Sequence, residues 1–518
     1  MLMSCLSPLR ISIASCLLVA FGCTSTSEGG SEVPAPADAL PALVAVPDAE
    51  DVGRIVDADG REVLLRGVNV NAHIEYWQYD PELFTTYPFI DRDADMVAAM
   101  GWNMVRLGLS WSRVEPEPGE YDEEYLDELA EAVAMLRERG VYTLMDLHQD
   151  PWSPHVVAPP DQECPEGARP TGGWDGAPEW ALFDDGLPRC EVIGAPRELI
   201  PVVQAAWRNF MDDVEGPGGV GIRTRYAQMF GHLVARFAQD DSVVGYEVIN
   251  EPALFEPGQE VQLTDFYEDC LAEMRAAEDR VGAPRRLFFF EPSVGWNAVG
   301  LPAPPPFDHD DQVVYAPHIY QGGIDPPTLE GGFARAAQDS TMLYGGAPVV
   351  TTEWGSGPDR AKDPEDDYFE RHLQEQDSYR FGAAIWTWRE ACGDAHKYNE
   401  VRDGKIPEVW GFFEVDCETN TIEGERTEYR DTIQKMALRF APGALSEVDW
   451  AKDDTELSAS GDDAPSGNRL EVFVPTDDAT TVSVESTGLG AVESVPWFGG
   501  TLFYARAEGG SWSIRLTR

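Results

Sequence analysis

Two glutamates of this chain each follow directly on a short run of apolar residues. Glu251 stands in Asn250-Glu251-Pro252 after the run 243–249, and Glu353 stands in Glu353-Trp354-Gly355 after the run 348–352. A carboxylate at the carboxyl end of a buried strand lies where an α/β barrel builds its active site. Hydrolysis of a glycosidic bond requires two such groups, because one protonates the leaving oxygen and the other attacks the anomeric carbon. Either glutamate alone could be an ordinary surface residue, but their shared context favours a catalytic pair.

The elements that would position this pair alternate between short apolar strands and amphipathic helices. Eight strands are predicted, at 64–70, 104–109, 141–147, 243–249, 287–290, 313–317, 349–352 and 382–387. Helices are predicted at 91–100, 123–139, 202–239, 265–277, 332–343, 366–379 and 427–440. This alternation predicts an α/β fold of the (β/α)8 TIM barrel type. An open doubly wound sheet is the alternative, but the first strand is not followed by the glycine-rich phosphate loop of that fold.

The pattern changes after Pro442-Gly443, where apolar residues alternate with period two. Strands predicted at 469–474, 481–485, 502–507 and 512–516 indicate a small antiparallel β-sandwich domain. We therefore expect a catalytic barrel over residues 51–441, which includes a small hairpin at 56–63, and a C-terminal domain over residues 442–518. Residues 24–50 are rich in Ser, Gly, Pro and Ala and are predicted to be a linker.

Residues 1–23 have the features of a secretory signal peptide. Arg10 precedes an apolar stretch from Ile11 to Phe21, and a small residue, Gly22, follows it. Gly22-Cys23 with the Ser, Thr and Gly residues that come next resembles a bacterial lipoprotein signal, in which Cys23 would be lipidated. We expect a protein that is secreted or lipid-anchored to the bacterial cell envelope.

The remaining cysteines are expected to form disulfide bonds if the protein is exported. Cys164 and Cys190 bracket one insertion and Cys392 and Cys417 bracket another, so each pair would hold a long loop over the mouth of the barrel. Cys270, on a predicted helix, is left over and is expected to be buried and inert. None of these cysteines has the spacing of a metal site, and no metal is expected.

The formal net charge of −54 over 518 residues restricts the possible partners. Nucleic acid and an anionic bilayer surface would both be repelled by such a protein. The length is enough for one large core and a smaller second domain. We expect a monomer that contacts a membrane only through a lipid anchor.

Polar or aromatic residues end six of the predicted strands, which is hard to explain by packing. In chain order they are Arg106, His148 and Asp150, Asn250 with Glu251, His318 with Tyr320, Glu353, and Trp386. This set resembles glycoside hydrolase family 5, a family of retaining barrel glycosidases, over about residues 60–400. The segment Asp146-Leu147-His148-Gln149-Asp150 and the appended β domain look most like endoglycoceramidases, which cleave the glycan from a glycosphingolipid at the glucose–ceramide linkage.

The resemblance implies a role for each of these residues. Glu251 would be the general acid/base and Glu353 the nucleophile, kept ionised by Arg106 and hydrogen-bonded by Tyr320. Asn250 would bind the sugar 2-hydroxyl. The other substrate-binding residues would be His148, Asp150, His318 and Trp386, the last as the floor of the sugar subsite. Endoglycoceramidases carry a lysine shortly after the first strand, and here His73 or Glu75 would replace it.

The sequence thus predicts a retaining glycoside hydrolase whose partner is a carbohydrate or glycolipid substrate and which needs no cofactor. One alternative is an endo-β-glucanase or another family 5 hydrolase of polysaccharide, which would have an open groove lined by Trp. Another is a carbohydrate-binding protein on a decayed barrel, against which the presence of both Glu251 and Glu353 argues. A lipid substrate instead predicts apolar surface beside the sugar site. The candidates for it are Trp152, Trp174, Trp180, Leu182, Phe183, Leu254 and Phe255.

Overall fold

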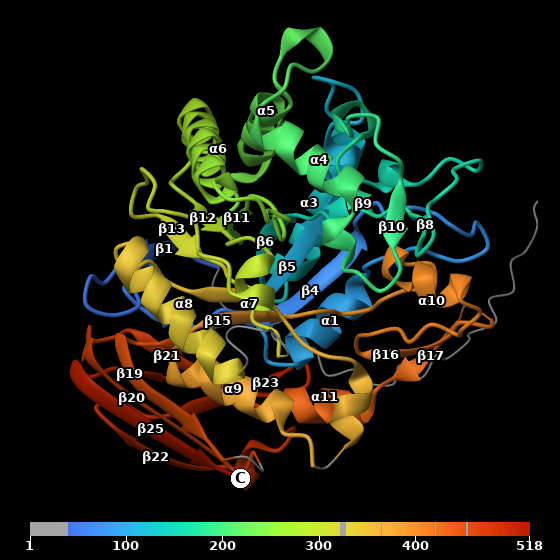
Figure 1. Ribbon diagram of the computed structural model, residues 1–518. Coiled ribbons are helices and arrows are strands. Elements are labelled where there is room, and N and C mark those ends of the chain that lie inside the picture. The colour runs from blue at the N-terminus through green and yellow to red at the C-terminus, as the bar shows by residue number, and fades with distance from the viewer. Residues whose placement is uncertain (1–39, 322–327, 364, 420, 452–453) are drawn as a thin grey trace, which may run out of the picture. The chain divides into compact units, whose positions relative to one another are not determined.

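The computed structural model describes residues 40–321, 328–363, 365–419, 421–451 and 454–518 (Figure 1). The predicted signal peptide, Cys23 and residues 24–39 of the predicted linker lie outside these ranges. Within them, the structure contains no helix with the length and apolar character that crossing a membrane requires.

Eight parallel strands form the central sheet, in the order β13-β12-β11-β6-β5-β4-β15-β14. Their bounds are β4 Arg66–His73, β5 Met104–Leu109, β6 Tyr142–Leu147, β11 Val243–Glu247, β12 Leu287–Phe290, β13 Val313–Tyr315, β14 Val350–Trp354 and β15 Gly382–Ile385. A parallel bridge between Tyr315 and Val349 brings the two ends of the sheet together. The sheet is therefore a nearly closed (β/α)8 barrel, and each strand lies within a few residues of its predicted range.

Helices lie between the barrel strands along the chain, and seven of them have nine residues or more. They are α1 Asp91–Ala99, α3 Glu123–Arg137, α4 Pro201–Met211, α5 Ile222–Phe237, α6 Gln259–Val281, α8 Leu329–Leu343 and α9 Tyr368–Ser378. The prediction of a single helix over 202–239 is wrong, because α4 and α5 are separated by the segment 212–221. Within it, Pro217 lacks a backbone N–H, and Gly218 and Gly219 both have a φ of 75°, so the chain cannot continue as a helix there.

The C-terminal part of the chain is a β-sandwich. One sheet has the order β1-β2-β3-β18-β21-β24-β23 and the other the order β19-β20-β25-β22. Their bounds are β1 Leu43–Val46, β2 Arg54–Asp57, β3 Glu62–Val63, β18 Ala437–Ala441, β19 Ala444–Trp450, β20 Glu456–Ala464, β21 Arg469–Val474, β22 Ser483–Thr487, β23 Glu493–Trp497, β24 Gly500–Arg506 and β25 Gly510–Thr517. Side chains of both sheets, such as Val472, Phe503 and Trp512, share one buried cluster.

The helix predicted over 427–440 is wrong in its second half. α11 covers only Thr427–Ile433, and β18 follows at Ala437–Ala441. Leu438 and Phe440 are both buried, but in two different clusters, and the pairing of β18 with β21 shifts its register between them. Pairing of β18 with β3 and β21 satisfies the backbone of this segment, which overrides its helical pattern.

The first three strands contradict the predicted linker and barrel boundary. β1 lies inside the range predicted to be a linker, and β1, β2 and β3 all belong to a sheet of the sandwich. Leu43 is 1% exposed, and it is buried in one cluster with Met104 and Val244 near the starts of barrel strands. Residues 43–46 are therefore ordered by apolar burial against the base of the barrel.

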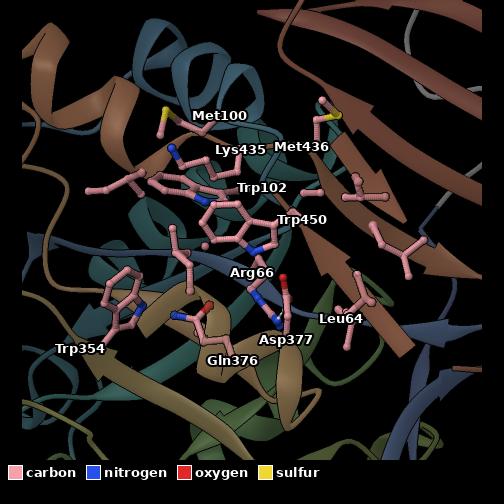
Figure 2. Close-up of a pocket in the computed structure, with 18 residues that line it drawn as sticks. Leu64, Arg66, Met100, Trp102, Trp354, Gln376, Asp377, Lys435, Met436 and Trp450 are labelled. Carbon is pink, nitrogen blue, oxygen red and sulfur yellow. Dashed lines mark hydrogen bonds and ion pairs between the residues drawn. The ribbon is translucent and has the colours of Figure 1, made fainter. Parts of the chain in front are cut away.

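A small cavity of about 50 Å³ lies between the barrel and the sandwich (Figure 2). Arg66 at the start of β4 donates to Asp377 of α9 over 2.7 Å, and Trp450 of β19 lines the same space. Trp354, the residue after Glu353, also lines it. The packing around this cavity therefore links the sandwich to the strand that carries Glu353.

Both predicted disulfide bonds are present in the structure. Cys164 is bonded to Cys190 with a Cα–Cα distance of 5.8 Å, and Cys392 is bonded to Cys417 with a Cα–Cα distance of 5.5 Å. Cys270 in α6 is free and buried, as predicted.

Candidate active site

Glu251 and Glu353 both lie near one nitrogen of the same imidazole at the carboxyl ends of the barrel strands. His318 Nδ1 lies 2.8 Å from Glu251 Oε1 and 3.5 Å from Glu353 Oε2. One oxygen of each carboxylate and one nitrogen of His318 are all within 4.8 Å of one another. Retaining glycosidases have their two carboxyl groups about 5–5.5 Å apart, whereas inverting enzymes leave room for a water molecule at about 6.5–9.5 Å. The short separation fits a retaining reaction.

The turn after β14 allows the strand end to lie close to β15. Gly355 has a φ of 150°, and a Cβ atom there would stand 2.6 Å from the carbonyl oxygen of Trp386. Only glycine has no Cβ atom to clash at such an approach. The Glu353-Trp354-Gly355 segment therefore lies directly against Trp386, which brings a carboxylate and an aromatic ring to the same part of the barrel mouth.

Glu251 itself has a backbone conformation that side-chain-bearing residues rarely adopt. Its φ is 38°, in the left-handed region, which costs of order 1 kcal/mol or more for a residue other than glycine. Two contacts hold it there. The Glu251 N–H donates to Glu291 Oε2 over 3.1 Å, and Gln149 Nε2 donates to the Glu251 carbonyl over 3.1 Å.

Arg106 is the charged centre of the site. It is fully buried in β5 and contacts the carboxylates of four residues at 2.5–3.4 Å: Asp146, Glu247, Glu291 and Glu353. Burial opposes its charge, but these carboxylates outweigh that effect and raise the pKa of the guanidinium well above its ordinary value. Its Nη1 donates to Glu353 Oε1 over 2.8 Å, so it stabilises the anionic form of that carboxylate. Arg106 also donates to Asn250 Oδ1 and Asn69 Oδ1.

Tyr320 contacts Glu353 from the side opposite Arg106. Its hydroxyl donates to Glu353 Oε2 over 2.9 Å. Burial and the charges of Glu353 and Glu251 raise the pKa of Tyr320 well above its ordinary value, so the phenol keeps its proton. The structure thus brings together most residues of the predicted set: Arg106, Asn250, Glu251, His318, Tyr320 and Glu353.

A second polar cluster adjoins this site and contains the other predicted sugar-binding residues. The His148 and Trp386 rings stack with centroids 5.1 Å apart, and His148 Nδ1 lies 2.7 Å from Asp146 Oδ2. Asp150 contacts Arg197 at 3.0 Å and His396 at 2.9 Å. Burial would raise the pKa of Asp150, but Arg197, His148 and His396 hold it well below its usual range.

His73 is the one predicted site residue that the structure leaves apart. Within the described ranges, no hydrogen bond or ion pair joins its imidazole to either glutamate. Its carbonyl accepts a hydrogen bond from Tyr125, and burial together with the charge of Arg113 lowers the pKa of the imidazole to about 4. His73 is therefore neutral at pH 7 and does not supply the positive charge of a lysine. Its role in substrate binding stays a prediction.

Sequence reasoning missed several members of these networks. Glu291 directly follows β12, so the rule that found the other strand-end residues could have found it as well. Glu247 is the last residue of β11 but falls inside the predicted strand 243–249, and its buried carboxylate accepts from Thr352 over 2.6 Å. Arg197 comes from the short turn between the first insertion and α4, and His396 comes from the segment after β15. No local pattern marks these last two residues as neighbours of Asp150.

Among the residues that the structure describes, two groups of side chains could in principle offer ligands to a metal ion. They are Glu247 and Glu291 with His318, and Glu251 and Glu353 with His318. The Arg106 guanidinium, however, already lies 2.5 Å from Glu247 and 2.8 Å from Glu353. A second cation would be repelled there. The Arg106 charge therefore argues against a metal ion at either group.

Comparisons with known proteins agree with this geometry. Residues 56–391 match the family described as Cellulase (glycosyl hydrolase family 5). The chain is 32% identical over 339 residues to Endoglycoceramidase I of Rhodococcus hoagii (strain 103S), a match that covers 59% of this chain and 62% of that protein. A crystal structure of endogalactoceramidase superposes with a TM-score of 0.80 at 34% identity and covers 92% of this chain and 99% of that one. Endo-glycoceramidase II from Rhodococcus sp., in complex with a cellobiose-like isofagomine, superposes with a TM-score of 0.67 at 25% identity, covering 89% of this chain and 98% of that one.

A barrel that carries two glutamates at the ends of its fourth and seventh strands defines a glycoside hydrolase of the retaining geometry. The chain belongs to glycosyl hydrolase family 5.

Proposed function

We propose that this protein is an endoglycoceramidase-like enzyme that releases the glycan from a glycosphingolipid by double displacement. The observation that carries the proposal is an apolar pocket beside Glu251 in a family 5 barrel. The names of the Rhodococcus hoagii relative and of both solved structures point to the same substrate class.

In this mechanism Glu353 is the nucleophile and Glu251 the acid/base. Glu353, paired with Arg106, attacks the anomeric carbon while Glu251 gives its proton to the departing ceramide oxygen. A water molecule then enters, Glu251 takes a proton from it, and the resulting hydroxide releases the sugar from Glu353. Asn250, fixed by Arg106, is placed for the sugar 2-hydroxyl. The stacked pair His148 and Trp386 forms one wall of the sugar subsite.

The lipid part of the substrate would lie on the Glu251 side, because the acid must reach the leaving oxygen. A pocket of about 250 Å³ adjoins that side and is lined mainly by apolar or proline side chains, among them Leu254, Phe255, Leu263 and Leu301. Ser293 lines this pocket too, and it also lines a second pocket of about 260 Å³ whose lining includes Glu251, His318 and Tyr320. The two pockets are therefore neighbours that meet at Ser293.

Two of the other predicted lipid contacts are too buried to touch a lipid. Trp152 and Trp174 are only 2% and 4% exposed and pack in the core, so they are wrong as an apolar shelf. An open groove for polysaccharide needs tryptophan rings that face solvent, and Trp152 and Trp174 do not face it. Trp386 is 7% exposed. Phe255, which is half-buried and lines the apolar pocket, remains the best supported contact for ceramide.

We expect short-chain fluorescent lactosylceramide to be hydrolysed to lactose, with cellotetraose left intact. Phe255→Ser should lower kcat/KM for the lipid about tenfold, because burial of such a side chain is worth about 1.5–3 kcal/mol. Hydrolysis of a water-soluble aryl β-lactoside should change much less. Met342→Ser, at a residue of α8 that is 70% exposed, is the matched control. Cleavage of cellotetraose with lactosylceramide untouched would favour the polysaccharide alternative.

We further propose that the protein is exported and acts as a monomer, either secreted or anchored to the bacterial cell envelope through Cys23. The signal-like residues 1–23 support export, as do the two disulfide bonds, which persist in oxidising compartments. In a bacterial host that processes lipoproteins, Cys23→Ser should move the protein from the membrane fraction to the soluble fraction. An unchanged distribution of the variant would exclude the lipid anchor.

A further inference from the structure

Glu291 is a third carboxylate beside the proposed catalytic pair, and the double-displacement mechanism leaves it without a task. It directly follows β12 and is only 1% exposed. Its Oε2 accepts the main-chain N–H of Glu251 over 3.1 Å and lies 3.3 Å from His318 Nε2. Its Oε1 lies 3.4 Å from Arg106 Nη2. One oxygen of Glu291 therefore contacts both the main chain of Glu251 and the imidazole that contacts its side chain.

The position of Glu291 decides which proton His318 can offer to Glu251. An ionised Glu291 has no proton on Oε2. The contact between Oε2 and His318 Nε2 is therefore favourable only when Nε2 carries a proton. If His318 is neutral and its one ring proton is on Nε2, its Nδ1 has no proton to donate. Only the charged imidazolium, which has a proton on both nitrogens, can then donate from Nδ1 to Glu251 Oε1. A carboxylate at residue 291 thus favours the imidazolium form that holds the Glu251 side chain.

We propose that Glu291 is a positioning residue for the acid/base, which fixes the main chain of Glu251 directly and its carboxyl group through His318. The inference rests on the proposed role of Glu251. It accounts for the left-handed backbone of Glu251, since the N–H that this conformation turns toward β12 meets an acceptor of fixed position. It also accounts for burial of an additional carboxylate in the site.

Charged groups on the surrounding strands agree with a protonated His318. Glu251 and Glu353 face its Nδ1 and Glu291 faces its Nε2, while Arg106 contacts Glu291 and Glu247 lies near it. Burial and the charge of Glu247 raise the pKa of Glu291 well above its ordinary value, and the positive charges of His318 and Arg106 act against this rise and favour the ionised carboxylate. Burial of His318 opposes its protonation, but Glu291, Glu353 and the hydrogen bond with Glu251 outweigh burial and raise the pKa of the imidazole well above its ordinary value. Removal of the Glu291 charge should lower that pKa.

Two variants distinguish a positioning role of Glu291 from a general contribution of Glu291 to the stability of the protein. Glu291→Ala removes both contacts, and Glu291→Gln leaves an oxygen acceptor without the charge. For Glu291→Ala we expect kcat/KM on lactosylceramide or an alkyl lactoside to fall about 10- to 100-fold, part of the effect of a general acid. A 2,4-dinitrophenyl lactoside, whose leaving group needs no proton, should lose less than about threefold in kcat/KM. Glu278→Gln, at a buried carboxylate of α6 that bonds Arg275 and Arg286, is the control.

The pH profile of Glu291→Gln gives a readout that a merely structural role would not move. At the acidic end of the pH profile, Glu291→Gln should keep most of the kcat/KM that Glu291→Ala loses. Its alkaline limb on the alkyl lactoside should shift to lower pH, because His318 with a lowered pKa gives up its Nδ1 proton earlier. An equal loss on both classes of leaving group, or an unshifted limb, would overturn the inference. Failure of the unmodified enzyme on every lactoside would instead overturn the proposed function.

Discussion

Glu353→Gly is expected to abolish hydrolysis and to convert the enzyme into a catalyst of glycoside synthesis. Without the nucleophile no glycosyl-enzyme intermediate forms, and loss of such a residue costs roughly 10⁴-fold or more in kcat. The cavity left by the side chain would accept an α-lactosyl fluoride, whose configuration resembles that of the missing intermediate. Glu251 would then act as the base for an acceptor alcohol, and the β-linked product would accumulate because it is no longer cleaved.

The measurement is product formation from α-lactosyl fluoride and a ceramide-like alcohol, compared with hydrolysis of an aryl β-lactoside. The barrel should still fold, because Arg106 keeps its contacts with Asp146, Glu247 and Glu291. A matching melting temperature for Glu353→Gly and the unmodified enzyme would verify this. Residual hydrolysis above about 1% in a correctly folded variant, far above the level that loss of a nucleophile leaves, would remove Glu353 from the nucleophile role.

Glu251→Ala should reduce kcat/KM for lactosylceramide by about 10²- to 10⁴-fold, the usual contribution of a general acid. The first step on a 2,4-dinitrophenyl lactoside should be nearly unaffected, because its leaving group departs without a proton. The second step still needs a base, so the glycosyl-enzyme should accumulate. Sodium azide, an anion that attacks without a base, should restore turnover and yield β-lactosyl azide.

The azide product distinguishes Glu251 from its neighbours. Alanine at His318 or Glu291 leaves the Glu251 carboxylate in place, so azide should accelerate those variants little. An equal loss of Glu251→Ala on both lactosides, with no azide product, would show that Glu251 is not the acid/base.

The sequence was informative where one short segment carries the whole signal. Glu251 and Glu353 each end an apolar run, and the predicted strands at 104–109 and 287–290 coincide with β5 and β12. The strand-end rule places such side chains at one edge of the barrel regardless of how far apart they are in the chain. Arg106, His318 and Tyr320 were predicted in the same way, and the structure brings them into contact with the glutamates.

Residues that depend on distant contacts could not be predicted in this way. Glu247 ends β11, but the predicted strand continued to residue 249, and only contacts with Arg106 and Thr352 distinguish Glu247 from a polar surface residue. Arg197 and His396 meet Asp150 from two separate loops. β18 has a helical apolar pattern, but pairing with β3 and β21 overrides it, because backbone pairing is decided by partners elsewhere in the chain.

The pairing of β3 with β18 has a consequence for how the chain matures. Phe440 pairs with Val63, and Ala441 pairs with Glu62. The residues that complete this sheet are therefore made after the whole barrel has been synthesised, and contacts so distant in sequence form slowly. Until they form, β1–β3 have an open edge, and such an edge is prone to pair with other chains. Expression of the barrel without β18 and the strands after it, residues 437–518, should therefore yield aggregates rather than a free catalytic domain, whereas insertions at exposed loop tips should be tolerated.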